Sequence, residues 1–200
     1  ALVEALCRLF RDLGGTLRLS SPVEQIVTDR ARIVGVRTAG HTVPADVVVS
    51  NADVVHTYAK LLKDEPRAAS PARRVAKMRH SMSLFILYFG TNRKFPHLAH
   101  HNILFCIRYE SLLRDIFDRG VVADDFSLYL HMPSATDDSF APPGCDAFYV
   151  LSPVPNLRTF AGDWATLAPK YADRILDYID RRYAPGLREA VVVRRCFTPQ

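Results

Sequence analysis

An apolar run that becomes abruptly polar and then resumes with helical spacing is the feature that most limits how this chain can fold. Residues 46–49 read Asp-Val-Val-Val and are followed by the polar Ser50, Asn51 and Asp53. Apolar side chains then recur on one helical face, at Val54, Val55, Tyr58, Leu61 and Leu62. The pattern predicts a strand, a junction and a helix. In open α/β sheets ligands bind at the carboxyl end of a strand, whereas the simpler interpretation is a helix start with Asp53 or Asn51 as the N-cap.

The residues before this junction predict the rest of an α/β segment. Leu2, Leu6, Leu9 and Leu13 share one face of an amphipathic helix, and the glycine pair 14–15 is expected to end it. Strands are expected at residues 16–20, in a hairpin of 23–29 with 32–38, and at 41–50. A helix followed by strands that close on a strand-to-helix junction is typical of an α/β domain.

The chain changes character after this segment, and we expect a second domain over residues 64–200. Residues 65–81 are polar and interrupted by proline, as in a linker with a short helix. Strands are expected at 82–89, 126–131, 147–152 and 190–197, with helices at 109–118 and 169–183. Antiparallel strands with helices beside them indicate an α+β domain. The predicted fold is therefore α/β plus α+β, with domains at 1–63 and 64–200.

Composition and charge exclude some functional classes. The 200 residues are 48% hydrophobic and carry a net charge of +5, but the arginines and lysines are scattered rather than grouped with stacking aromatics, which disfavours nucleic-acid binding. Contact with an anionic membrane surface fits the charge equally well. The longest apolar run, residues 82–90, has the length of a strand and not of a membrane span. Because the chain starts inside an amphipathic helix without a methionine, we expect it to be a piece of a longer protein.

Cysteines and histidines give no metal motif. Cysteines stand far apart, without a C-x-x-C pair, at Cys7, Cys106, Cys145 and Cys196, so reduced thiols in a cytoplasmic protein are expected. On a helix, His97 and His100 would lie together beside His101, but Pro96 precedes them and no carboxylate or cysteine is close in sequence. His56 and His131 stand alone in their patterns. The sequence therefore predicts surface or packing histidines and no metal site.

Other catalytic patterns are equally lacking. The serines have no G-x-S-x-G setting, and the paired aspartates at 124–125 and 137–138 lie where turns favour aspartate. Neither G-x-G-x-x-G nor a P-loop occurs in the 200 residues. From residue patterns alone no catalytic residue can be named, and the prediction stops at an α/β segment beside an antiparallel sheet.

Several stretches in a fixed order carry a family resemblance. They are LVEALCRLFRDLGGTLRLSSPVEQIV, ADVVVSNADVVHTYAKLL, SLFILYFG, LAHHNI, DFSLYLHMPSATDDSFAPPGCDAFYVLSPVPNL and PGLREAVVVRRCFTP. Together they span nearly the whole chain, which resembles the bacterial-type phytoene desaturases, FAD-dependent flavoproteins of the amine-oxidase-like superfamily. The blocks around residues 50–58 and 138–155 resemble the lycopene- or neurosporene-forming branch.

The resemblance implies that residues 1–63 are part of a Rossmann-like FAD-binding domain. In that superfamily, Val23 matches a residue whose backbone pairs with adenine, and Ser50, Asn51 and Ala52 match a turn where a sheet strand passes close to the cofactor. Asp53 is expected to remain a helix cap, because its carboxylate would repel the diphosphate. The family's glycine-rich dinucleotide motif and its C-terminal flavin-contacting segment are not in the chain, so the 200 residues alone are expected to bind FAD poorly.

The resemblance also implies that residues 64–200 are a substrate-binding domain, whose C-terminal end is expected to return toward the FAD domain. In relatives an antiparallel sheet forms the floor of a long apolar tunnel. Alternate side chains of the strand at 82–89 are candidates to line it, either Phe85, Leu87 and Phe89 or Ile86 and Tyr88, together with Tyr129. Plain core packing of the same residues is the alternative.

The activity implied is dehydrogenation of phytoene, a C40 isoprenoid, toward neurosporene or lycopene. FAD takes a hydride at N5 while the neighbouring carbon loses a proton, and a quinone or oxygen is the expected electron acceptor. A cytoplasmic protein bound peripherally to the membrane is expected, because the substrate is lipid-soluble. The alternatives are a related FAD-dependent polyene isomerase or saturase, another amine-oxidase-like flavoenzyme, or a catalytically silent relative.

Overall fold

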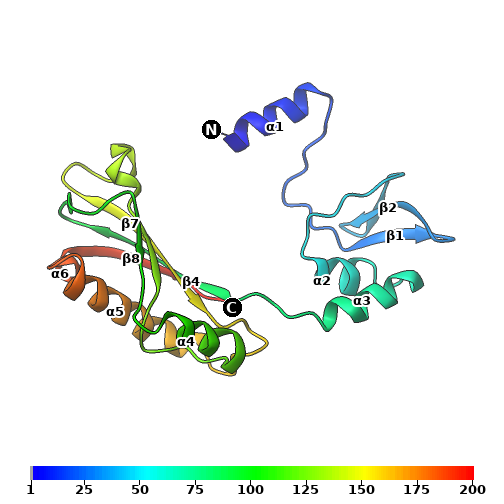
Figure 1. Ribbon diagram of the computed structural model, residues 1–200. Coiled ribbons are helices and arrows are strands. Elements are labelled where there is room, and N and C mark those ends of the chain that lie inside the picture. The colour runs from blue at the N-terminus through cyan, green and yellow to red at the C-terminus, as the bar shows by residue number, and fades with distance from the viewer. Residues whose placement is uncertain (1) are drawn as a thin grey trace. The chain divides into compact units, whose positions relative to one another are not determined.

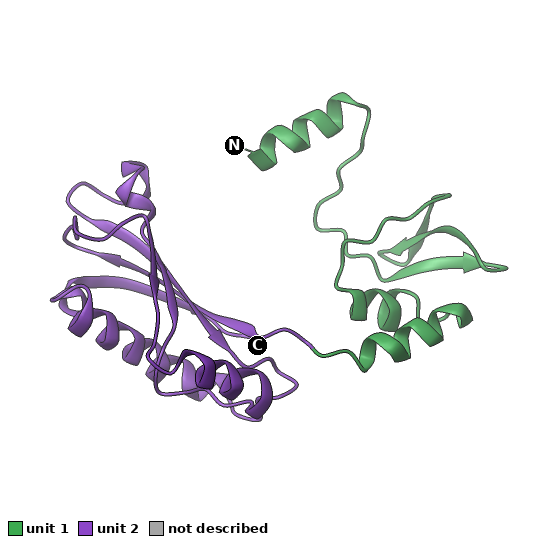
Figure 2. Cartoon of the chain, in the orientation of Figure 1, with its two compact units in different colours: residues 1–79 green, residues 80–200 purple. Residues whose placement is uncertain are grey.

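The computed structural model describes residues 2–200, which form two compact units (Figure 2). The first ends at Arg79 and the second begins at His80. This division falls after the helices at Pro66–Ala68 and Ala69–Ala76, which pack on the helices before them in the first unit. The boundary expected after residue 63 was therefore placed too early: the segment predicted to be a linker is built into the first unit.

The first unit contains a small antiparallel sheet (Figure 1). Helix α1 (Leu2–Asp12) precedes the sheet, whose strands run in the order β1 (Gln25–Asp29), β2 (Arg32–Thr38) and β3 (His41–Pro44). The predicted helix and hairpin are thus confirmed. The strand predicted at residues 16–20 is not formed. No residue of α1 is buried, so the apolar face of this helix is exposed.

The strand-to-helix junction differs from its prediction on one side. Strand β3 stops at Pro44, and residues 45–52 form no strand, with Val49 91% exposed. On the other side, Asp53 caps α2 (Val54–His56): its side chain accepts hydrogen bonds from the backbone N–H groups of Val55 and His56, at 2.8 and 3.2 Å. The helices η1 (Thr57–Leu61), η2 (Pro66–Ala68) and α3 (Ala69–Ala76) follow. The N-cap interpretation of Asp53 is confirmed, and the buried strand before it is not formed.

The second unit is built on a five-stranded antiparallel sheet with the order β5-β6-β7-β4-β8. The strands are β4 (Ser83–Thr91), β5 (His101–Leu104), β6 (Leu128–His131), β7 (Asp146–Val154) and β8 (Val191–Phe197). The helical segments are α4 (Tyr109–Arg114), η3 (Asp115–Arg119), η4 (Pro133–Ala135), η5 (Asp138–Phe140), α5 (Trp164–Arg182) and α6 (Leu187–Ala190). Four of these strands and both main helices match predicted positions, whereas β5 was missed.

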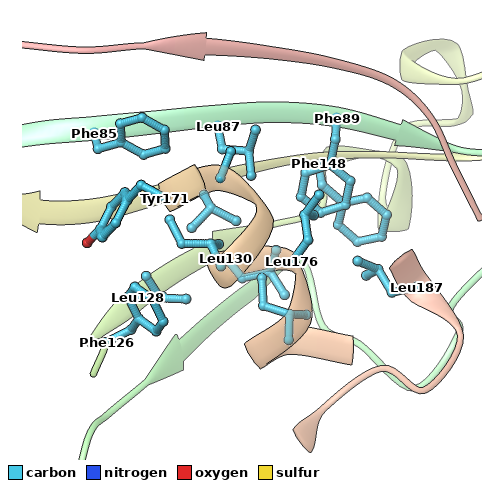
Figure 3. Close-up of a cluster of buried hydrophobic side chains, with 14 of the residues drawn as sticks. Phe85, Leu87, Phe89, Phe126, Leu128, Leu130, Phe148, Tyr171, Leu176 and Leu187 are labelled. Carbon is cyan, nitrogen blue, oxygen red and sulfur yellow. The ribbon is translucent and has the colours of Figure 1, made fainter. Parts of the chain in front are cut away.

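The core lies between the sheet and α5, which runs along one face (Figures 1 and 3). Phe85 and Leu87 of β4 are fully buried there, with Ile175 and Ile179 of α5. Asp163 fixes the start of this helix, because its side chain accepts hydrogen bonds from the N–H groups of the first turn. Burying an apolar side chain such as Leu87 or Ile175 stabilises the fold by about 1.5–3 kcal/mol. Within residues 2–200, no helix is both long and apolar enough to cross a bilayer.

Candidate functional site

The face of the second unit's sheet that points away from α5 carries the candidate site, and we call it the open face. Strict alternation along the strands sends every second side chain to it. Strand register aligns these side chains in two rows across all five strands. One row is His101, His131, Tyr149, Tyr88 and Arg195, and the other is Ile103, Tyr129, Leu151, Ile86 and Phe197.

Two apolar grooves lie at opposite ends of the open face along β4. One has a cavity volume of about 250 Å³, and its lining includes Met82, Leu84, Ile103, Tyr129, Leu151 and Pro153. We call it the α4 groove, because residues of α4 also line it. The other has a volume of about 380 Å³, and its lining includes Tyr88, Gly90, Phe140, Ala147, Val193 and Arg195. The nine residues of β4 connect them, a rise of roughly 30 Å. A long apolar molecule laid along this strand would contact both grooves.

Aromatic rings stand between the two grooves. Tyr149 lies 5.5 Å from Tyr88, 5.8 Å from Tyr129 and 4.5 Å from His131, centroid to centroid. Burial, and then a hydrogen bond with Tyr129, raise the pKa of Tyr149, so its hydroxyl stays protonated at neutral pH. The middle of the open face therefore offers π surfaces and neutral hydroxyls, which suit an apolar ligand and can stabilise developing positive charge.

Three histidines form a cluster at the β5–β6 end of the open face. The Nε2 atoms of His131 and His100 are 2.6 Å apart, and one ring nitrogen of each of these residues and of His101 lies within 4.8 Å of the others. Nδ1 of His100 is 2.7 Å from Oγ1 of Thr136, and Nδ1 of His101 is 2.6 Å from the hydroxyl of Tyr129. Burial, followed by the charges of His100 and His101, lowers the pKa of His131, which is therefore neutral at pH 7.

The predicted cofactor residues all lie in the first unit and are exposed. Val23 precedes β1, while Ser50, Asn51 and Ala52 precede α2. The Ser50 hydroxyl shares a 2.8 Å hydrogen bond with that of Thr57, which ties the junction to η1. Their role toward FAD stays a prediction.

The residues of the first unit fit a flavin dinucleotide in part. The exposed backbone at residue 23 and at residues 50–52 is accessible to a ligand. In contrast, Asp53 already occupies the N-terminus of the three-residue α2 with its own carboxylate, so a diphosphate is not expected there. With no glycine-rich phosphate loop in the 200 residues, this unit does not hold a complete dinucleotide site.

Of the predicted channel residues, the structure separates two groups. Phe85 and Leu87 are 0% exposed and pack in the core with α5, which favours plain core packing over the predicted channel lining. Phe89, 3% exposed, packs in the same core and also belongs to the lining of the 380 Å³ groove. Tyr88 and Tyr129 lie on the open face and remain candidates. The alternation of the strand was predictable, but both sets of side chains are apolar, and only the packing of α5 decides which set is covered.

His131 was noticed in the sequence but given no role, and Tyr149 was missed. Each is a lone residue within an apolar strand pattern, and its neighbours come from other strands. The pairing of His101 with His131 and of His131 with Tyr149 is set by strand register, which no local pattern records. The histidines at 100 and 101 were noticed, but a helical spacing was considered for them, whereas they belong to a loop and to β5.

The structure is of a mixed α/β class: a small antiparallel sheet with helices is followed by a five-stranded antiparallel sheet, whose open face is a long apolar surface. The chain belongs to the flavin containing amine oxidoreductase family, whose model matches residues 1–168. It is 50% identical over 200 residues to a phytoene desaturase (lycopene-forming) of Pseudescherichia vulneris, and 46% identical to one of Pantoea ananas. A phytoene desaturase (neurosporene-forming) of Rhodobacter capsulatus is 41% identical.

These three alignments cover all of this chain, but the chain spans only about 40% of the length of each relative. Among solved structures, an oxidoreductase from Methanosarcina mazei matches with a TM-score of 0.67 at 15% identity, over 98% of this chain and 41% of that one. This second likeness supports the mixed α/β fold, independently of close sequence similarity.

Proposed function

We propose that the protein containing this chain is an FAD-dependent phytoene desaturase, which introduces double bonds into a C40 isoprenoid toward neurosporene or lycopene. The observation that carries the proposal is the open face, with apolar grooves at both ends of β4. A C40 polyene is almost entirely apolar and gains free energy when such a surface removes it from water. The similarity to three desaturases over the whole chain supports this substrate class.

In this proposal the chain's own residues bind and orient the substrate. Leu84, Ile86 and Leu151 contact the polyene and exclude water, and the rings of Tyr88 and Tyr149 face positive charge that develops on it. Val23 and residues 50–52 contact the cofactor. FAD, when bound, would supply the oxidising chemistry of a dehydrogenation, in which one carbon gives up a hydride and its neighbour a proton.

We also propose that the protein is cytoplasmic, binds the membrane peripherally, and passes its electrons to a quinone or to oxygen. The support is a pair of large apolar side chains close to the α4 groove. Phe105, which lines that groove, is 63% exposed, and Ile107 is 95% exposed. Two large, exposed apolar side chains two residues apart suit contact with a lipid surface.

The experiment that tests the activity uses the whole protein, expressed in cells that accumulate phytoene. A coloured polyene in the extract is the expected result, and its absorption gives the chromophore length and so the number of double bonds. A protein that carries FAD but leaves phytoene unchanged would contradict the proposal and favour a polyene isomerase or saturase.

The experiment that tests the open face compares two leucines of the second unit. Leu151→Glu places a charge on the floor of the α4 groove, so the coloured product should be lost. Leu157→Glu changes an exposed leucine outside the described grooves and should leave the pigment unchanged. Equal pigment from the two variants would show that the polyene does not lie on this face.

The membrane proposal is tested by cosedimentation with vesicles of anionic lipid. Changing Phe105 and Ile107 together to serine removes the exposed apolar pair and should shift the protein to the supernatant. Val121→Ser alters another exposed apolar residue and serves as the control. Unchanged sedimentation of the double variant would place the membrane contact elsewhere.

A further inference from the structure

The histidine cluster on the open face is not used by the proposed desaturation, and one ring nitrogen of each of its three residues lies within 4.8 Å of the others. Three rings come from three places: His100 precedes β5, His101 begins β5, and His131 ends β6. Their ring centroids are 4.3 Å apart for His100 and His101, 4.5 Å for His100 and His131, and 5.2 Å for His101 and His131. The strand register that pairs His101 with His131 holds two of the rings in place.

Hydrogen bonds on the outer side of the cluster select which nitrogens point inward. The Thr136 hydroxyl donates to the carbonyl of Pro133, at 3.5 Å, and so accepts from Nδ1–H of His100 at 2.7 Å. This tautomer leaves a lone pair on Nε2 of His100, directed at Nε2 of His131. The Tyr129 hydroxyl lies 2.6 Å from Nδ1 of His101, so Nε2 is the ring nitrogen of His101 that remains for a ligand.

A metal-binding histidine characteristically has its second ring nitrogen held by an outer partner, which fixes the tautomer and the orientation of the ring. His100 and His101 both meet this condition through hydroxyl groups. We propose that His100, His101 and His131 bind a divalent transition-metal ion through their Nε2 atoms, as a three-histidine site completed by water. Imidazole ligands suit Zn²⁺, Cu²⁺ and Ni²⁺, and three histidines with one open position form a known tetrahedral zinc arrangement.

The distances are compatible with this arrangement after a small adjustment. Zinc–nitrogen bonds of about 2.0–2.1 Å in a tetrahedron place two ligand nitrogens about 3.4 Å apart. The 2.6 Å between Nε2 of His100 and Nε2 of His131 would therefore widen by less than about 1 Å. His101 is exposed and approaches from the solvent side, so its ring can follow. The bound ion would join three segments: β5, which is a four-residue edge strand, the loop before β5, and β6.

The test is a titration of the whole protein, freed of metal by a chelator, with Zn²⁺ in a calorimeter and with Co²⁺ as a spectroscopic probe. We expect the protein to bind one equivalent of either ion. Bound Co²⁺ should show the visible absorption of a tetrahedral site, and added Zn²⁺ should displace the Co²⁺ and remove that absorption. His131→Gln should abolish binding, and so should His101→Ala. Because His101 is exposed, a loss of binding in the second variant cannot be explained by misfolding. Thr136→Val, which removes only the outer partner of His100, should weaken binding by about 10–100-fold.

His97→Gln is the matched control, because His97 lies in the same segment but bonds to the backbone carbonyl of Tyr183 instead of the cluster. It should bind the metal as the unchanged protein does. If the unchanged protein takes up no stoichiometric metal, or if His101→Ala binds it equally well, the proposal is wrong. The 2.6 Å contact is then a hydrogen bond between the two rings of His100 and His131.

Discussion

The two faces of the second unit's sheet are made by the same strands, but one is buried under α5 and the other is partly exposed. Along β4, Leu87 points to α5 and is fully buried, whereas Leu84, three residues earlier, points to the open face and is 38% exposed. Both faces are apolar, but within the second unit only the first is packed along β4 by a long helix, α5, whereas α4 and η3 line one end of the other. The comparison teaches that apolar character in a strand does not distinguish core from ligand surface; the helix that packs on it does.

The sharpest way to break this comparison is to shorten the two leucines. Leu87→Ala should lower the free energy of unfolding of the whole protein by about 2–5 kcal/mol, because it leaves a cavity under α5. Leu84→Ala should change it by less than about 1 kcal/mol, since the side chain is partly in water already. The measurement is the midpoint of urea unfolding, with the slope of the transition compared between variants.

The same pair also has an opposite expectation for activity. Leu84 lines the α4 groove, so its loss should reduce the yield of polyene although the protein stays folded. Two leucines with equal effects on stability would mean that the faces are not different, and a Leu84→Ala protein with unchanged product would remove this residue from the substrate surface.

Elements with a strong local pattern were predictable, and contacts made by register were not. The length and apolar composition of residues 82–90 predicted β4, and the apolar spacing around Ile175 and Ile179 predicted most of α5. Strand β5 has only four residues, two of them polar, and exists because it pairs with β6. The histidine cluster follows from that pairing, so it could not be inferred from the sequence spacing of His131.

The junction around Asp53 separates local from non-local information in a similar way. The cap was predictable because aspartate before a helix satisfies the first free N–H groups, and Asp53 does this. The valines before it were expected to be a buried strand, but within the described residues no partner strand lies beside 45–52. A strand needs its neighbour, and that requirement is invisible in the local pattern.

A buried pair of hydroxyl groups on the face covered by α5 gives a second test of the difference between the two faces. The hydroxyls of Ser152 and Tyr171 are 2.8 Å apart between β7 and α5, and burial raises the pKa of Tyr171 to about 12. Because the folded pKa lies above the unfolded value of 10.0, this group contributes stability below pH 10 that is lost as the pH rises toward 12. The loss should reach about 2–3 kcal/mol.

Tyr171→Phe cannot ionise and tests that slope. Its unfolding free energy, measured at several values between pH 9 and pH 12, should fall less steeply than that of the unchanged protein. At neutral pH the variant should be less stable by about 1–3 kcal/mol, because the Ser152 hydroxyl loses its partner. Parallel curves for the two proteins would show that Tyr171 titrates like an exposed tyrosine and that the covered face is open to water.

The smallest effect concerns the helix that makes the two faces unequal. Asp163→Ala removes the cap of the 19-residue α5 and should lower the melting temperature of the whole protein by about 1–3 °C. Hydrogen bonds from the Thr166 hydroxyl and the first N–H groups lower the pKa of Asp163. The contribution of the cap is therefore present above the ordinary carboxyl pKa and disappears as the pH falls through the lowered folded pKa.

Asp53→Ala is the matched control. The same type of cap there serves a three-residue helix with no buried residue, so this variant should change the melting temperature less. Equal shifts for the two variants would mean that capping acts only locally and that α5 is held on the sheet by its packed face alone.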